Sequence, residues 1–305
     1  MPQWSPEIEV DERLARRLIG DQFPELDLRS MRRFGVGWDN VVWQLDGEVV
    51  FRFPQRAIAV PGVEREMAVL PHLAPLLPLP VPVPRFRGRP AHGYPWPFFG
   101  SSLLPGVEAC EAGLSDEARA GLAPPLAAFL ATLHSPAVAG AVAAAYELPD
   151  DPMGRAEMAR RVHYTQEVLS EVTGLGLWDP PASVSRLLDS ARQLPRPQPV
   201  AVVHGDLHFR HLLLNKRGRL SAVIDWGDVC RGAPSVDLHL YWSLLPPDAR
   251  PAFLEVYGAV GDEELLRARV LAIFLCAVLA VYGHREGMQN VLREALGGLH
   301  RAALD

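Results

Sequence analysis

The sequence predicts an α+β fold in which a strand-rich first third precedes a mainly helical remainder. Residues 41–45 and 49–53 follow a rough period of two, in which Val49, Phe51 and Phe53 fall on one face, as is typical of strands with one buried face. From Glu117 onward, apolar residues recur at spacings of three and four, which is typical of helices packed on a core. At 305 residues, the chain is long enough for two lobes with substantial cores.

The composition excludes several classes of protein. A hydrophobic content of 49% with 22% charged residues is ordinary for a soluble globular chain and does not indicate disorder. The net charge of −6, without a basic run, argues against nucleic acid as a partner. The 3 cysteines are odd in number and widely spaced, which favours reduced thiols in a cytosolic protein. The start of the chain lacks the basic segment and apolar core of a signal peptide, so we expect a cytoplasmic location.

The longest apolar stretch runs over residues 270–283. It is shorter than the roughly 20 residues needed to cross a bilayer. We therefore expect a buried helix there and no membrane partner.

In the first lobe, a peripheral helix is expected over residues 11–19, where apolar residues line one side. Residues 28–45 follow as a strand hairpin interrupted by Gly35 and Gly37. A glycine-containing hairpin lets backbone amides approach phosphate groups, although two glycines are also common in ordinary turns.

A third strand is expected within residues 47–56, where Arg52 points away from the face that carries Phe51 and Phe53. Arg52 could equally be a surface side chain on an edge strand. The next segment, residues 63–73, has apolar residues at helical spacing and predicts a short amphipathic helix.

Prolines dominate residues 71–97 and favour extended structure over a long helix. A strand is expected over residues 94–104. A proline-rich segment that binds the groove of another protein is the alternative, but the apolar flanks favour burial. Helices are then expected over residues 118–135, 153–172, 181–194, 247–260 and 263–304.

Residues 200–241 interrupt the helices with a strand, a loop and a hairpin. Asp206 follows the first strand, His211 begins the second and Asp225 ends the third. A compact hairpin would bring these side chains to one mouth, where they could hold a divalent cation and a reacting hydroxyl. A zinc site made by His204, His208 and His211 is a second interpretation, which we rate lower because the histidines fall on a loop without the spacing of a helical zinc motif.

Two motifs in this stretch carry a family resemblance. HGDLHFRH, followed by IDWGD, resembles the catalytic loop and the metal loop of the aminoglycoside phosphotransferases. His211 occupies the place of the usual Asn, as it does in the 2''-aminoglycoside phosphotransferase branch. The resemblance implies a bilobal protein-kinase-like fold with a small antiparallel-sheet lobe and a larger helical lobe. It implies a nucleotide-binding lobe over residues 1–103 and a catalytic and substrate-binding lobe over residues 104–305.

The resemblance also implies roles for the loop residues. Asp206 would be the catalytic aspartate, and His211 with Asp225 would bind Mg²⁺. Asp237 would brace the backbone of the catalytic loop, although it could equally cap a helix.

In the first lobe, Arg52 takes the place of the lysine that holds the nucleotide phosphates in this family. Lys216 is the only lysine in the chain and lies in the turn of the hairpin. Glu66 would orient Arg52 through an ion pair, with Glu64 as the competing candidate. Gly35 and Gly37 would approach the phosphates.

The resemblance implies transfer of the γ-phosphoryl group of ATP or GTP, with Mg²⁺, to a hydroxyl of an aminoglycoside-like or other small acceptor, and hence a role in antibiotic resistance. A macrolide, a choline-like alcohol or a sugar are alternative acceptors. A non-catalytic kinase-like nucleotide-binding protein is a separate alternative, motivated by Arg52 and His211. Residues 104–305 hold 18 basic and 24 acidic residues, so that part carries the whole net charge. This favours a cationic acceptor, or an acidic solvated surface.

Overall fold

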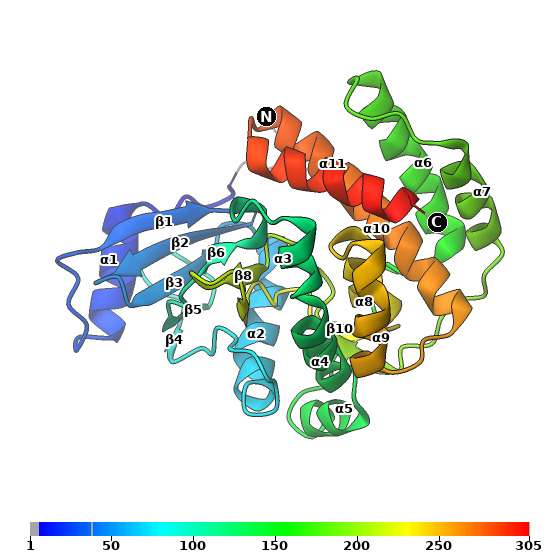
Figure 1. Ribbon diagram of the computed structural model, residues 1–305. Coiled ribbons are helices and arrows are strands. Elements are labelled where there is room, and N and C mark those ends of the chain that lie inside the picture. The colour runs from blue at the N-terminus through cyan, green and yellow to red at the C-terminus, as the bar shows by residue number, and fades with distance from the viewer. Residues whose placement is uncertain (1–5, 38, 305) are drawn as a thin grey trace.

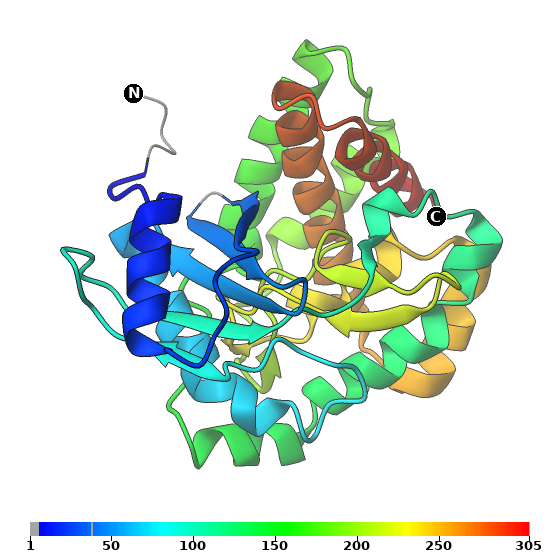
Figure 2. The ribbon, with the colours of Figure 1, turned by 90° about the vertical axis from the view of Figure 1, so that its left-hand side faces the viewer.

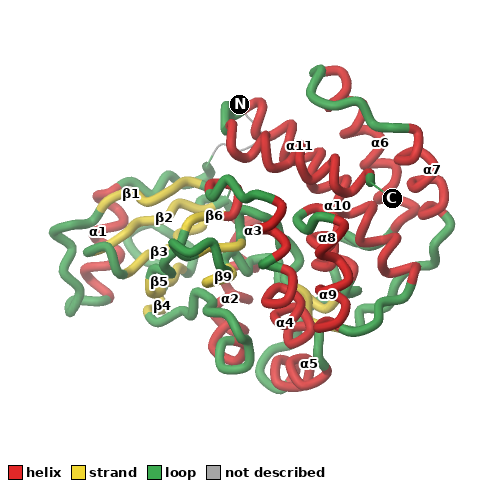
Figure 3. The backbone as a smooth tube through the Cα atoms, in the orientation of Figure 1, coloured by secondary structure: helices red, strands yellow, loops and turns green. Residues whose placement is uncertain are grey.

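The computed structural model describes residues 6–37 and 39–304. A small lobe built on an antiparallel sheet lies beside a larger helical lobe, as Figure 1 shows and as Figure 2 shows after a quarter turn. Figure 3 separates the two by secondary structure, with the sheet strands gathered on one side and most helices on the other.

The small lobe contains a five-stranded antiparallel sheet in the order β1-β2-β3-β5-β4. Its strands are β1 (Arg32–Val36), β2 (Asn40–Leu45), β3 (Val49–Pro54), β4 (Phe86–Gly88) and β5 (Phe98–Ser102). Helix α1 (Glu12–Gln22) is capped by Asp11, whose side chain accepts a hydrogen bond from the amide of Leu14. The helix packs on the sheet through a core that includes Ile19, Trp43 and Phe51. The predicted helix and the first three strands are confirmed.

Strand β3 lies in the interior of the sheet, between β2 and β5. The alternative that Arg52 is a surface residue on an edge strand is therefore wrong. Phe51 and Phe53 are fully buried, whereas Arg52 points to the opposite face, as the alternation of the sequence predicted.

Helix α2 (Val60–Leu73) follows the short 3-10 turn η1 (Ala57–Ala59). It begins three residues before the predicted start, because Pro61 lies in its first turn, where a proline needs no hydrogen-bond donor. The proline-rich segment after it is packed on the protein: Val81 is 4% exposed, and the amide of Val223 donates to the carbonyl of Pro80. The segment is therefore not a free proline-rich ligand, and it also forms β4, which was not predicted.

The large lobe is mainly helical. Its helices are α3 (Asp116–Ala120), α4 (Ala123–Leu133), α5 (Pro136–Ala143), α6 (Met158–Gly174), α7 (Ala182–Arg192), α8 (Ser235–Ser243), α9 (Arg250–Tyr257), α10 (Asp262–Arg285) and α11 (Gln289–Ala303), with 3-10 turns η2 (Ala109–Glu111) and η3 (Pro247–Ala249).

Several predicted helix boundaries were wrong. The single helix expected over residues 263–304 is two helices, because the chain turns at Gly287, which has φ +66. The helix expected over residues 118–135 divides into α3 and α4, and α5 was not predicted. The helix expected from residue 153 begins at Met158.

The expected hairpin is present in the large lobe. Strands β8 (Leu212–Leu214) and β9 (Leu220–Val223) pair antiparallel, and β6 (Val107–Glu108) joins them in a three-stranded sheet. Strand β7 (Ala201–Val203) precedes the loop of His204 and Asp206, and pairs with β10 (Cys230–Gly232). The β8–β9 turn carries Lys216, which is exposed.

Helix α10 contains the longest apolar stretch. Among the described residues, α10 is the one helix that is by itself long and apolar enough to cross a membrane. Residues 116–133 and 136–143 pass the same test only when they are taken together as a bent pair. Inside the protein, 61% of the most apolar part of α10 is buried. The prediction of a buried helix is confirmed.

Candidate active site

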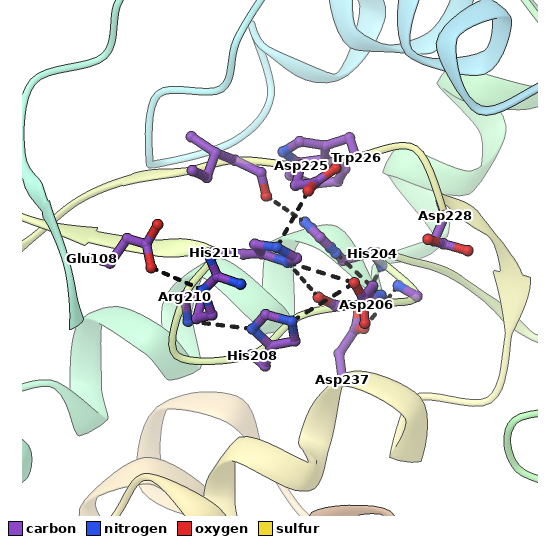
Figure 4. Close-up of polar contacts among 12 residues, drawn as sticks. Glu108, His204, Asp206, His208, Arg210, His211, Asp225, Trp226, Asp228 and Asp237 are labelled. Carbon is purple, nitrogen blue, oxygen red and sulfur yellow. Dashed lines mark hydrogen bonds and ion pairs between the residues drawn. The ribbon is translucent and has the colours of Figure 1, made fainter. Parts of the chain in front are cut away.

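The loop after β7 and the loop after β9 bring the predicted polar residues together, as Figure 4 shows. His211 Nε2 lies 3.3 Å from Asp225 Oδ2, and His211 Nδ1 lies 3.8 Å from Asp206 Oδ2. The carboxylates of Asp206 and Asp225 remain 38% and 41% exposed, so both face open space. The sequence prediction that these three side chains meet at one mouth is confirmed.

Hydrogen bonding fixes the orientation of the His211 ring. Its Nδ1 lies 2.7 Å from the backbone carbonyl oxygen of Asp206, which can only accept, so Nδ1 carries a proton. In the neutral ring, the lone pair therefore lies on Nε2, beside the carboxylate of Asp225. The carboxylate of Asp225, with open space around it, fits a Mg²⁺ ion that takes its other ligands from phosphate oxygens and water. The imidazole nitrogen of His211 is a weaker ligand for Mg²⁺, which prefers oxygen.

Burial and charged neighbours shift the pKa values of His211, Asp225 and Asp206. Burial lowers the pKa of His211, but the carboxylates of Asp225 and Asp206 outweigh burial and raise that pKa to about 9. Burial likewise opposes the charge of Asp225, but Arg52 and His211 hold its pKa well below the usual range. Although 38% of its side chain is exposed, the surrounding protein removes water from the Asp206 carboxylate and raises its pKa to about 7, against an opposing effect of His211 and with a further contribution from Asp228 and Asp225.

Arg52 links the small lobe to residues 224–228, which we call the metal loop after the family segment that they resemble. Its Nη1 lies 3.0 Å from Glu66 Oε1, and its Nη2 lies 2.7 Å from Asp225 Oδ1. Glu66 is fully buried, whereas Glu64 is exposed. Of the two candidates, the structure therefore brings only Glu66 to Arg52.

Helix α2 also contacts the metal loop directly. Glu66 Oε1 accepts a hydrogen bond of 2.9 Å from the amide of Trp226, and Arg65 donates to the carbonyl of Gly227. A Cβ atom at Gly62 would lie 2.9 Å from the carbonyl oxygen of Gly227, so the two backbones approach as closely as glycine permits. The metal loop is thus held against α2 from several sides.

The two glycines of the β1–β2 hairpin differ in their surroundings. Gly35 pairs with Val42, and Val42 pairs with Arg52, so the three lie in one row across neighbouring strands. Directly opposed residues share a face of the sheet, which places Gly35 on the face of Arg52. The amide of Gly37 already donates to the carbonyl of Asn40, 2.8 Å away, and closes the turn.

Asp237 braces the loop that carries Asp206. Its carboxylate accepts hydrogen bonds from the amides of His204 and Gly205, at 2.7 and 3.1 Å, and contacts His134 Nε2 at 3.2 Å. Helix α8 has no side-chain cap bond from its N-cap residue. The contacts of Asp237 are therefore those of a residue that holds the loop backbone, and not those of a helix cap.

The histidines of the loop do not form a three-histidine metal site. His204 Nε2 bonds to the carbonyl of Ile224 at 3.0 Å, and its Nδ1 accepts from the amide of Asp206 at 3.3 Å. Potential ligand atoms of Asp206, His208 and His211 do lie within 4.8 Å of one another. However, His211 Nδ1 is already bonded to a backbone carbonyl, so the geometry does not favour the zinc interpretation.

Several residues of the site gave no local signal in the sequence. Arg155 binds Asp151 at 2.8 Å and also reaches Asp228, the last residue of the IDWGD motif. His134 contacts Asp237 from the end of α4. These pairs join positions 73 and 103 residues apart, and only the folded chain brings them together.

Comparison with known proteins agrees with the sequence resemblance. The model of the phosphotransferase enzyme family matches residues 30–271, which include both loops of the site. The uncharacterized protein YcbJ of Bacillus subtilis (strain 168) is 28% identical over 104 residues, which are 32% of this chain and 34% of that protein. The aligned part spans about a third of the length of that curated relative.

Solved structures share the fold over nearly the whole chain. The GDP and kanamycin complex of APH(2")-IIia superposes with a TM-score of 0.67 at 23% identity, covering 94% of this chain and 97% of that one. Macrolide 2'-phosphotransferase MphH from Brachybacterium faecium gives a TM-score of 0.57 at 20% identity, covering 93% and 98%. The predicted bilobal kinase-like fold is confirmed, and because the family match covers most of the sequence, the chain belongs to the phosphotransferase enzyme family.

Proposed function

We propose that this phosphotransferase transfers the γ-phosphoryl group of ATP or GTP, with Mg²⁺, to a hydroxyl of a small aminoglycoside-like acceptor. The observation that carries the proposal is the convergence of Asp206, His211 and Asp225 at one mouth. Arg52 reaches the carboxylate of Asp225 from the sheet. Phosphoryl transfer needs mainly positioning and charge stabilisation, which such a set of side chains supplies.

In this proposal, Asp206 accepts a hydrogen bond from the acceptor hydroxyl and takes its proton as the bond to phosphorus forms. Its position at the edge of the site, with a raised pKa, suits a base that works near neutral pH. His211 Nε2 and Asp225 would hold Mg²⁺, which when bound neutralises charge on the phosphate oxygens.

Arg52 would bind the nucleotide phosphates. Arginine is permanently charged and can bind phosphate through two N–H groups, so it can replace a lysine in this role with altered geometry. Glu66 holds one end of the guanidinium, which leaves the end now on Asp225 to turn to a phosphate. Gly35 lies in the same row of the sheet, and we assign Gly35 and Gly37 to the phosphate-binding hairpin. Residues 1–103 would be the nucleotide lobe and residues 104–305 the catalytic and acceptor lobe.

A cationic amino sugar is the acceptor class that the charges favour. The carboxylates of Asp206, Asp225 and Asp228 are 38–46% exposed at the same mouth and would attract ammonium groups, although Arg52 and Arg155 offset part of their charge. Relatives with the same fold include the gentamicin complex of APH(2")-IIa and the streptomycin and ATP complex of that protein. Neutral sugars, choline-like alcohols and macrolides remain alternative acceptors, the last because macrolide phosphotransferases share the fold.

The proposal is tested with purified protein, Mg²⁺, and ATP or GTP against a panel of kanamycin, gentamicin, a macrolide, choline and a neutral sugar. We expect nucleotide consumption stimulated by an aminoglycoside, with phosphate found on that acceptor by mass spectrometry. Stimulation by the macrolide or by choline alone would keep the phosphotransferase and change its acceptor.

A non-catalytic nucleotide-binding protein is the second candidate, and one observation favours it. Arg52 Nη2 occupies Asp225 Oδ1, an oxygen that would otherwise be available to a cation. Calorimetric titration with Mg²⁺-nucleotide, compared with the hydrolysis rate of the same sample, separates the two. Tight binding of Mg²⁺-nucleotide, with no nucleotide turnover in the presence of any acceptor of the panel, would establish the second candidate.

We also propose a cytoplasmic location. Cys110, Cys230 and Cys276 are all buried free thiols, which suits a reducing compartment.

A further inference from the structure

We infer that His208 is a positioning residue that orients the carboxylate of Asp206. This inference rests on the proposed function, because it assigns the donor that aligns the proposed base. His208 lies in the loop between Asp206 and β8 and is 7% exposed. Figure 4 shows its ring between Arg210 and Asp206.

The tautomer of His208 follows from its backbone contact. The amide of Arg210 donates to His208 Nδ1 at 3.3 Å, so Nδ1 holds a lone pair. The proton of the neutral ring is therefore on Nε2. A protonated nitrogen cannot bind a metal, so His208 Nε2 is a hydrogen-bond donor and not a ligand.

This donor faces the carboxylate of Asp206. His208 Nε2 lies 3.8 Å from Asp206 Oδ2, which is the same oxygen that faces His211 Nδ1 at 3.8 Å. The proton on His211 Nδ1 already goes to the backbone carbonyl of Asp206. His208 is consequently the imidazole that can donate a hydrogen bond to Oδ2. Hydrogen bonds in an active site are often long without substrate and shorten when substrate binds.

The ring of His208 is held in place by stacking. Its centroid lies 3.9 Å from that of His211 with an interplanar angle of 28°, and Phe209 flanks it at 5.8 Å. If this donor closes the 3.8 Å gap to Oδ2 when substrate binds, it directs the other oxygen, Oδ1, toward the acceptor hydroxyl. His208 thus selects which oxygen of Asp206 receives the proton.

The test compares His208→Gln with His208→Leu. The glutamine amide keeps an N–H at nearly the place of Nε2, whereas leucine has a similar volume and no donor. We expect His208→Leu to lower kcat about tenfold or more, with the KM for nucleotide within about twofold, and His208→Gln to recover most of the loss. Equal kcat values in the two variants, or wild-type kcat in both, would overturn the inference.

A double-mutant cycle with Asp206→Asn separates positioning from a general structural defect. If His208 acts through Asp206, His208→Leu should lower kcat much less in the Asp206→Asn background than in the wild-type background. The same loss in both backgrounds would overturn the inference while leaving the proposed function intact. An inactive wild-type protein would instead overturn both.

Nitrogen chemical shifts of the labelled imidazoles give a measurement that does not depend on activity. The full chain should show His208 as the neutral Nε2–H tautomer, and the assignment comes from the loss of that signal in His208→Gln. An Nδ1–H tautomer would contradict the inference, because the donor would then point away from Asp206.

Discussion

Asp206 and His211 share their surroundings but have different tasks in the proposed reaction. The backbone carbonyl of Asp206 fixes the ring of His211, while the side chain of Asp206 faces outward at 38% exposure. In the proposal, the same residue would therefore orient the metal ligand through its main chain and serve the acceptor through its side chain. Substitution of the side chain should spare the first of these roles.

Asp206→Asn should lower kcat by at least about 100-fold, because an amide cannot take the proton of the acceptor hydroxyl. The Kd for Mg²⁺-nucleotide should change by less than about twofold, since the backbone contact to His211 persists. Steady-state kinetics and calorimetry measure the two quantities on one preparation. Wild-type turnover in this variant would remove Asp206 from the proposed catalytic role.

Binding of Mg²⁺-nucleotide should release a proton from His211. The pKa of this imidazole is raised to about 9, so the ring is protonated at neutral pH, and a metal binds only its neutral form. The affinity should therefore rise as the pH approaches about 9 and become level above it. Calorimetry in two buffers of different ionisation enthalpy counts the protons released.

The matched control for this experiment is His211→Asn, in which the side chain at position 211 does not titrate and the proton release should disappear. Equal proton release in the variant and the wild-type protein would show that His211 does not bind the metal.

At the scale of elements, helix α2 and the metal loop form one unit. Glu66 and Arg65 both bond to the loop backbone, and Gly62 leaves room for the carbonyl of Gly227. The loop that holds Asp206 packs closely on the metal loop in turn, since a Cβ at Gly205 would lie 2.3 Å from the carbonyl oxygen of Asp228. Helix α2 thus contacts the metal loop directly and reaches the loop of Asp206 only through it.

Gly62→Ala should separate α2 from the metal loop, because its methyl group would meet backbone rather than a flexible side chain. We expect a loss of about 1–3 kcal/mol in the free energy of unfolding, together with weaker Mg²⁺-nucleotide binding. Urea unfolding and calorimetry provide the measurements. Gly140→Ala is the matched control, since a Cβ there would meet nothing within 4 Å. Wild-type stability and affinity in Gly62→Ala would show that the close approach is not needed.

At the scale of the whole molecule, the acidic residues lie mostly in the helical lobe, with 24 acidic and 18 basic residues over residues 104–305. Three of these carboxylates lie exposed at the mouth of the site. The proposed acceptor would therefore be attracted by charge over some distance.

The apparent affinity for an aminoglycoside should weaken as salt rises from low to physiological concentration, because ions screen the attraction. The affinity for a neutral acceptor serves as the control and should change little. Turnover at fixed nucleotide, measured over a salt series, supplies both values. A salt-independent response to the aminoglycoside would contradict recognition by charge.

The sequence predicted the parts of this molecule that depend on local patterns. Alternation predicted β2, β3 and the outward direction of Arg52, and the motif spacing predicted that Asp206, His211 and Asp225 lie together. The break at Gly287 and the start of α2 at Val60 were not predicted, because glycine and proline act according to their place in a helix. The contacts of Arg155 and His134 join distant segments, which no local pattern reveals.

The single lysine of this chain has a consequence for chemical labelling. Kinase reagents that trap the phosphate-binding lysine through its amine would meet a guanidinium at Arg52 and should leave this site unmodified. The only side-chain amine, that of Lys216, lies exposed in the β8–β9 turn. An amine-reactive dye could therefore be attached to one defined side chain of the hairpin that carries the site.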